Sequence, residues 1–319
     1  MAVNADKTNI WKADIAQSVD MYNDWFVNFA PKVYRETRRR TTEDVENALK
    51  WTTNLTNIEP MLLRQFPEIL PMLRMTTAPP IARDRLVGLA RVSKNLVENM
   101  EIDKRLPPKM SSVLIEAELK KIGQIIVRLA DRDLFPWLED NHLPSEKELY
   151  RAATIVADRL CGAATDPIIR NAQEQRQLKA ISGWLNQRGY KQVSGGNDSS
   201  VSDMQLGTYS FRRNVPVTME NERIVKIPID TVIMPLSAYP SEFPLLIEAK
   251  SAGDFTNTNK RRKEEAAKYF QLKRTYCERI RFVLFLCGYF DAGYLGYEAS
   301  EGIDWVWEHR IDDLTKFGV

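Results

Sequence analysis

Apolar residues recur at helical spacing through the first half of the chain. In the segment 111–132 they fall on one face of a helix, at Leu119, Ile122, Ile126 and Leu129. Residues 40–55 form a second such segment, which begins near Thr41, a residue whose hydroxyl can cap a helix. Residues 79–100 form a third, which opens on two prolines that a first helical turn tolerates. The first half is therefore predicted to be a group of helices.

The pattern changes after about residue 165. One more helix is predicted over 171–188, and Gly189 ends it. Apolar residues then gather in strand-like runs at 208–218, 224–234, 244–250, 281–290 and 303–310. A basic helix is predicted between the third and fourth runs, over 260–280, with Phe270 and Ile280 facing inward.

This order of elements predicts an α/β fold class. Residues 1–165 are expected to form a helical N-terminal domain, and residues 166–319 an α/β domain with a central mixed sheet flanked by helices. A chain of 319 residues with 44% hydrophobic content is long enough for one or two such domains.

Composition narrows the function only slightly. The net charge of +2, from 45 basic and 43 acidic residues, favours no particular partner. Residues 250–281 are locally basic, with ten Lys and Arg against four Asp and Glu. The three cysteines are far apart in the sequence and predict neither a disulfide framework nor a zinc site. Without a recognisable signal peptide or a long apolar run, a soluble cytoplasmic protein with no membrane partner is expected.

The run "PLLIEAK" carries the most informative chemistry. Side chains alternate along a strand, so Leu246, Glu248 and Lys250 share one face. Asp230 lies in the preceding strand-like run, with seventeen residues between it and Glu248. If the two runs form a hairpin, the two carboxylates meet. Two carboxylates and a backbone carbonyl suit Mg²⁺, and a lysine can orient or deprotonate a water or neutralise developing charge. The alternative is an exposed strand end with a salt bridge, since short motifs often match by chance.

Two further features favour a catalytic metal site over an exposed strand end. Glu174 lies on the predicted buried stripe of helix 171–188, where a carboxylate is either paired or serves as a ligand. The start of the basic helix offers Lys260, Arg261 and Arg262 to the phosphates of a nucleic acid. A basic run is also typical of an ordinary solvated helix face.

Reading of bases would need Arg or Lys for guanine and Asn or Gln for adenine. The candidates are Arg83, Arg85, Lys94 and Asn95 in the helical half, and Arg212 and Arg213 in the second half. Contacts to bases and contacts to phosphates remain alternatives for each of them. A palindromic site would call for a homodimer, because the two-fold symmetry of the protein then matches that of the DNA.

Asp230 followed by Glu248-Ala249-Lys250 resembles the signature of the PD-(D/E)XK nucleases. Longer stretches, "NIWKADIAQSVDMYNDWF", "RMTTAPPIARDRLVGLARVSKNLV" and "EAKSAGDFTNTNKRRKEEAAKYFQLK", resemble the XamI-type restriction endonucleases over most of the chain. The resemblance implies a restriction-endonuclease-like core and a type II enzyme that uses Mg²⁺. Such an enzyme cuts both strands of double-stranded DNA within a short palindrome and leaves 5′-phosphates. Relatives of this type cut GTCGAC and belong to restriction-modification systems with a cognate DNA methyltransferase.

The resemblance assigns roles to a few residues. Asp230 and Glu248 match the metal-binding acids, the carbonyl of Ala249 would be the third protein ligand, and Lys250 matches the catalytic lysine. Glu174 matches a helix acid found in many of these folds. In this chain Ile229 separates the proline of the signature, Pro228, from the aspartate. The proline is the most dispensable residue of that signature.

The resemblance leaves other functions open. The helical domain is expected to contact DNA or to mediate dimerisation. The alternatives are a repair or structure-specific nuclease, which would cut by DNA shape, and a catalytically silent DNA-binding module of the same fold.

Overall fold

The chain forms two compact units. The computed structural model describes residues 2–140, 142–194, 201–219, 222–239, 242–256 and 258–319, without the side chains of Ser202, Asn259, Lys260 and Arg261. One unit comprises Met1–Phe29 and Arg170–Val319, and the other comprises Ala30–Ile169. Two helices, α1 (Thr8–Trp51) and α8 (Glu146–Gln187), each contribute one end to each unit. The expected boundary after residue 165 lies close to one of these limits, but the expected domain 1–165 also included the first 29 residues, which the structure groups with the sheet.

Polar contacts near the N-terminus explain this grouping. The carboxylate of Asp304 accepts hydrogen bonds from the backbone N–H groups of residues 3–5. The side-chain amide of Asn4 donates to the carbonyl of Trp305 at 2.8 Å. Trp11 packs edge-on against the Trp305 ring, with 5.5 Å between ring centroids. These partners lie about 300 positions apart in the sequence, so no local pattern indicates them.

The second unit is helical, as predicted. Besides parts of α1 and α8 it contains α2 (Pro60–Gln65), a 3-10 turn (Pro67–Ile69), α3 (Leu70–Met75), α4 (Arg83–Ala90), α5 (Lys94–Ile102), α6 (Ser112–Leu129) and α7 (Trp137–Asp140). Leu63, Leu73, Leu86 and Leu119 are fully buried in its core. Among the described residues, no helix combines the length and the apolar character that a membrane crossing requires.

Two predicted helices differ from those in the structure. The segment 79–100 is split into α4 and α5, because Arg91 adopts a left-handed conformation (φ 51°) and ends α4. Thr41 was expected at a helix start but lies inside α1. Its hydroxyl donates to the carbonyl of Arg38 at 3.1 Å, a bond back into the preceding turn that replaces capping.

The first unit is built on a six-stranded mixed sheet, which confirms the predicted class. Its order is β1-β2-β3-β4-β5-β6, and β2, β3 and β4 pair antiparallel while the other pairs are parallel. The strands are β1 (Lys191–Gln192), β2 (Thr208–Thr218), β3 (Ile224–Met234), β4 (Leu245–Ala252), β5 (Arg281–Gly288) and β6 (Asp304–Trp307). The helices are α9 (Thr258–Tyr276) and α10 (Ala292–Ser300), with 3-10 turns at Val201–Asp203, Cys277–Arg279 and Glu308–Phe317.

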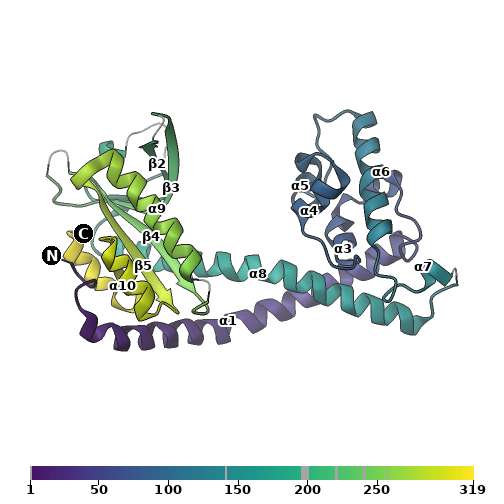
Figure 1. Ribbon diagram of the computed structural model, residues 1–319, viewed down its shortest axis with the longest axis horizontal. Helices are drawn as coiled ribbons and strands as arrows, with labels where there is room; N and C mark the ends of the chain where they lie inside the picture. The colour runs from purple at the N-terminus through teal and green to yellow at the C-terminus, as the bar shows by residue number, and fades with distance from the viewer. Residues whose placement is uncertain (1, 141, 195–200, 220–221, 240–241, 257) are drawn as a thin grey trace. The chain divides into compact units, whose positions relative to one another are not determined.

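Each face of the sheet has its own hydrophobic core. Leu246 of β4 packs on one face with Leu272 of α9 and Leu295 of α10. Ile247, its neighbour in sequence, packs on the other face with Ile181 of α8. Figure 1 shows α9 and α10 against the sheet. The alternation along β4 therefore places Glu248 and Lys250 on the same face as Leu246, toward α9.

Of the residues predicted to face inward from this helix, Phe270 does not, whereas Ile280, just beyond the end of α9, packs partly buried against the core. Phe270 is 65% exposed, whereas Leu272 is fully buried. Two charged residues of α9, Glu265 and Lys268, make contacts to β4 instead. The side of the helix nearest the sheet is thus partly polar, which a search for apolar spacing does not detect.

The hydrogen bonds that the Asp304 carboxylate accepts from residues 3–5 can be tested by mutation. Asp304→Ala would leave three backbone N–H groups without their acceptor, so we expect unfolding to require about 2 kcal/mol less free energy. Urea denaturation followed by tryptophan fluorescence measures this loss. Glu301→Ala, at an exposed position three residues away, is the matched control. Equal stabilities of the two variants would contradict the anchoring role.

Candidate active site

Asp230 and Glu248 lie where two strands separate. The β3–β4 ladder runs from Ile233–Leu245 to Thr231–Ile247, and the next residue on each strand is an acid. The backbone N–H of Ala249 donates to Oδ2 of Asp230 at 2.9 Å, a contact to a side chain in place of a ladder bond. The antiparallel pairing expected from the sequence is confirmed, and it brings the two acids together.

Glu248 is a buried carboxylate with two lysine partners. It is 4% exposed, and its Oε1 accepts hydrogen bonds from the ammonium groups of Lys250 at 2.9 Å and Lys268 at 2.6 Å. Its Oε2 is buried and has no hydrogen-bond partner. A buried charge needs such compensation, because the loss of hydration is otherwise costly. The structure therefore excludes the alternative of an exposed strand end.

Lys250 lies between two carboxylates. Its ammonium is 2.9 Å from Glu248 and 3.8 Å from Oε1 of Glu265 on α9. Burial by itself disfavours the charged form, but Glu248 and Glu265 outweigh it, so the pKa of Lys250 is raised. Lys250 is thus a cation at neutral pH, which favours charge neutralisation over deprotonation of a water.

Asp230 is destabilised as an anion. Burial and the nearby charge of Glu248 raise its pKa to about 6, although Lys250 and the Ala249 N–H act in the opposite direction. Two adjacent carboxylates, one of which has an unpartnered oxygen, suit a hard divalent cation. The residues present therefore fit the metal that the resemblance implies.

The protein would supply few ligands to such a cation. In the part of the chain that the structure describes, no group of three or more His, Cys, Asp or Glu side chains is arranged to hold a metal ion. A cation here would rest on Asp230, Glu248, the carbonyl of Ala249 and water. Mg²⁺ is a suitable ion, since it retains several waters in its protein sites.

Gln177 of α8 makes a polar contact to β4. Its side-chain amide donates to the carbonyls of Lys250 and Phe285, both at 3.2 Å. Glu174, expected on the buried face, is only half-buried and forms an ion pair with Arg212 of β2 at 2.7 Å. Gln177 lies one turn after Glu174, and its position on the stripe with Ile181 was the available signal.

The predicted DNA-contact residues of the helical unit differ in exposure. Arg85, Lys94 and Asn95 are exposed. Arg83 forms an ion pair with the buried Glu101 at 3.0 Å, so part of its binding capacity is already used. The first three are therefore the more accessible members of this set.

In the sheet unit, Arg212 and Arg213 point in different directions. Arg212 is exposed and has a left-handed backbone (φ 50°), whereas Arg213 is 4% exposed. This burial removes Arg213 from the residues available to DNA. Arg262 is half-buried, with its guanidinium 3.6 Å above the Tyr297 ring. The side chains of Lys260 and Arg261 lie outside the described residues.

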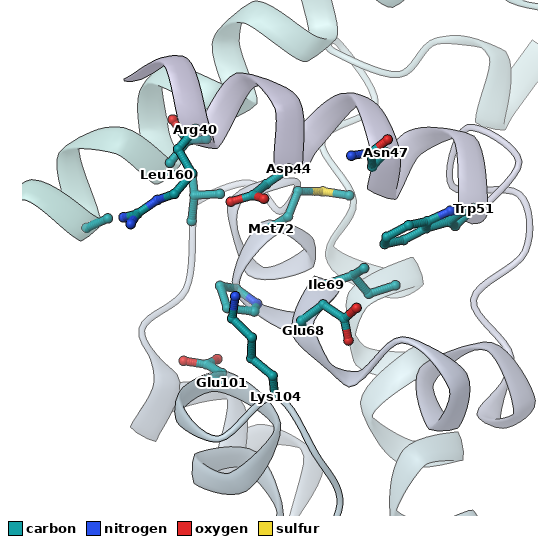
Figure 2. A pocket seen from close by; sticks show the side chains of 13 residues that line it. Arg40, Asp44, Asn47, Trp51, Glu68, Ile69, Met72, Glu101, Lys104 and Leu160 are labelled. Carbon is teal, nitrogen blue, oxygen red and sulfur yellow. The ribbon is translucent and has the colours of Figure 1, made fainter. Parts of the chain in front are cut away.

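A cavity of about 560 Å³ lies in the helical unit, whereas Asp230 and Glu248 belong to the sheet unit. Figure 2 shows Asp44 and Trp51 of α1 on its wall, with Glu68 and Lys104 opposite. Its lining holds three acidic side chains (Asp44, Glu68, Glu101) and two basic ones (Arg40, Lys104), so its charge does not select a polyanion.

Besides Gln177 and Lys268, three residues near the site were missed by sequence reasoning. Glu265 is 2% exposed, and Tyr294 of α10 donates a hydrogen bond to its Oε2. Glu298 of α10 is fully buried, and burial together with the Glu265 carboxylate raises its pKa to about 8. Helix α10 was not among the predicted elements, so no signal placed Tyr294 or Glu298 there.

Glu298 predicts a pH dependence of stability. Its folded-state pKa lies above the unfolded value of 4.5, so the folded protein holds a proton that the unfolded chain releases. Stability from this group is therefore lost as the pH rises from about 5 to 8. Glu298→Gln removes this titration. Between pH 5 and pH 8 the free energy of unfolding of the variant should therefore rise by roughly 3 kcal/mol relative to that of the wild type. Urea denaturation in EDTA at both pH values measures the gain, and parallel pH profiles would refute the assignment.

Comparison with known proteins gives one family match and one close relative. Residues 53–307, which include Asp230, Glu248, Lys250 and Lys268, match the family described as XamI restriction endonuclease. The chain is also 52% identical over 316 residues to the type II restriction enzyme SalI of Streptomyces albus G, covering 99% of each chain. No solved structure matches the chain.

Proposed function

Since the chain belongs to the XamI restriction endonuclease family and is therefore a type II site-specific deoxyribonuclease, we propose that it hydrolyses both strands of a short DNA palindrome at Asp230, Glu248 and Lys250. The reaction uses Mg²⁺ and leaves 5′-phosphates. The observation that carries the proposal is the convergence of the two acids and the lysine where β3 and β4 separate.

Asp230, Glu248 and the Ala249 carbonyl would hold the metal. When bound, Mg²⁺ polarises the phosphodiester and lowers the pKa of an attacking water. The Ala249 N–H holds the Asp230 carboxylate in place. Lys250, kept charged between two carboxylates, neutralises the negative charge that develops on the phosphate. Gln177 fixes the backbone of β4 at Lys250 by binding its carbonyl.

DNA contacts are proposed for the exposed basic and amide side chains. Arg85, Lys94 and Asn95 of the helical unit would contact bases or phosphates, and the start of α9 would contact phosphates. The helical unit thereby acts in DNA contact or in dimerisation. Glu174 would support the site through its ion pair with Arg212. A homodimer would match a palindromic site, and a methyltransferase of the same specificity would protect the host DNA.

The catalytic assignment is tested by removing its two central side chains. Glu248→Ala and Lys250→Ala should each lower the cleavage rate by about a thousandfold or more, since each removes transition-state stabilisation. DNA binding in Ca²⁺, measured by gel shift, should change much less. Lys273→Ala, an exposed lysine on α9, is the control and should cleave normally. Normal plasmid cleavage by both site variants would rule out the assignment.

The recognition site is tested separately. From the family resemblance we expect GTCGAC, so a plasmid with one such site should be linearised in Mg²⁺. A plasmid with one base pair of the site changed should stay uncut, because a wrong base pair costs about 1–3 kcal/mol of binding. Cleavage at another discrete sequence would revise the specificity alone. A smear without discrete fragments would instead favour a nuclease that reads DNA shape.

A further inference from the structure

Lys268 is a second lysine in the site, and the D…ExK pattern gives it no role. It lies on α9, its side chain is 20% exposed, and its ammonium is 2.6 Å from Oε1 of Glu248. The same ammonium donates to the carbonyl of Pro228 at 3.0 Å. It is therefore held by both strands that carry the acids.

The two contacts of Lys268 lie where β3 and β4 separate. Pro228 and Glu248 both lie beyond the last β3–β4 pair, Thr231–Ile247. Backbone hydrogen bonds no longer join the two strands there. Instead, the ammonium of Lys268 connects them by donating to the carbonyl of Pro228 on β3 and to Oε1 of Glu248 on β4. It thus restrains the diverging parts of β3 and β4 next to Asp230.

Lys268 also occupies the carboxylate that a metal ion would use. Oε1 of Glu248 already accepts two ammonium groups, while Oε2 is buried without a partner. Cations that share one carboxylate repel each other strongly at such distances in a partly buried site. The charge of Lys268 therefore opposes the entry of a divalent cation as well as stabilising Glu248.

We propose that Lys268 is the resident counter-cation of Glu248, which positions this acid in the metal-free protein and competes with the divalent metal for it. The inference rests on the proposed function, because it takes Asp230 and Glu248 as the metal-binding acids. It concerns metal affinity, so it is tested without DNA cleavage.

Two opposing effects follow from removing the ammonium. The Glu248 side chain becomes freer, which weakens metal binding slightly, since one immobilised side chain costs little. The repulsion between the ammonium and a divalent ion disappears, which strengthens binding by more. Lys268→Met should therefore bind Ca²⁺ about tenfold more tightly than wild type, while its melting temperature in EDTA falls.

The experiment is isothermal titration of the full-length protein with Ca²⁺ alone. Lys268→Arg keeps the charge and should bind Ca²⁺ like wild type. Lys273→Met makes the same change at an exposed position of the same helix and should also bind like wild type. If Lys268→Met does not fold, Lys268→Gln keeps a donor for the Pro228 carbonyl and removes only the charge.

The outcomes separate the two proposals. Wild-type binding that Glu248→Ala abolishes establishes the metal site, whatever Lys268 does. Against that background, unchanged or weaker Ca²⁺ binding by the folded charge-removing variants would overturn the role of Lys268. Absence of any Glu248-dependent Ca²⁺ binding in both the wild type and Lys268→Met would overturn the metal site itself, and the competition with it.

Discussion

The sheet unit depends on compensating the charge of Glu248, which the sheet buries almost completely. An unpaired carboxylate at this depth would cost several kcal/mol, so cations must reach it. One comes from the same strand, two residues on, and the other from α9. The requirement explains why α9 turns charged residues toward β4 and leaves Phe270 in solvent. The packing of this helix is thus set in part by the site it serves.

The compensation extends beyond the acid itself. Lys268, Glu248, Lys250 and Glu265 form a row of alternating charge, with successive separations of 2.6, 2.9 and 3.8 Å. At the end of this row, the hydroxyl of Tyr294 donates a hydrogen bond to Oε2 of Glu265. Each member is stabilised by its neighbours, so changing one alters the electrostatic surroundings of the next. The lysine of the motif is therefore held by residues that the motif does not contain.

Local patterns predicted the elements better than their contacts. The bounds of β2 and β3, helix α6 and the proximity of Asp230 to Glu248 followed from periodicity and spacing, because these depend on neighbours in the sequence. The continuation of α1 past Thr41 depends on a bond to Arg38 that competes with capping. The roles of Gln177 and Lys268 depend on which face of a helix meets the sheet. Side chains that join distant segments leave little trace in a single sequence.

The net charge of the site gives a reason why a metal ion and DNA would bind to it together. With Glu298 protonated at neutral pH, the row and Asp230 hold three carboxylates against two ammonium groups. The metal-free site is thus close to neutral, which allows it to be buried without a bound ion. A divalent cation would leave an excess of one positive charge, and a single phosphodiester would cancel it. The proposed site would therefore bind the cation most tightly when the DNA backbone is present, as cleavage of a phosphodiester requires.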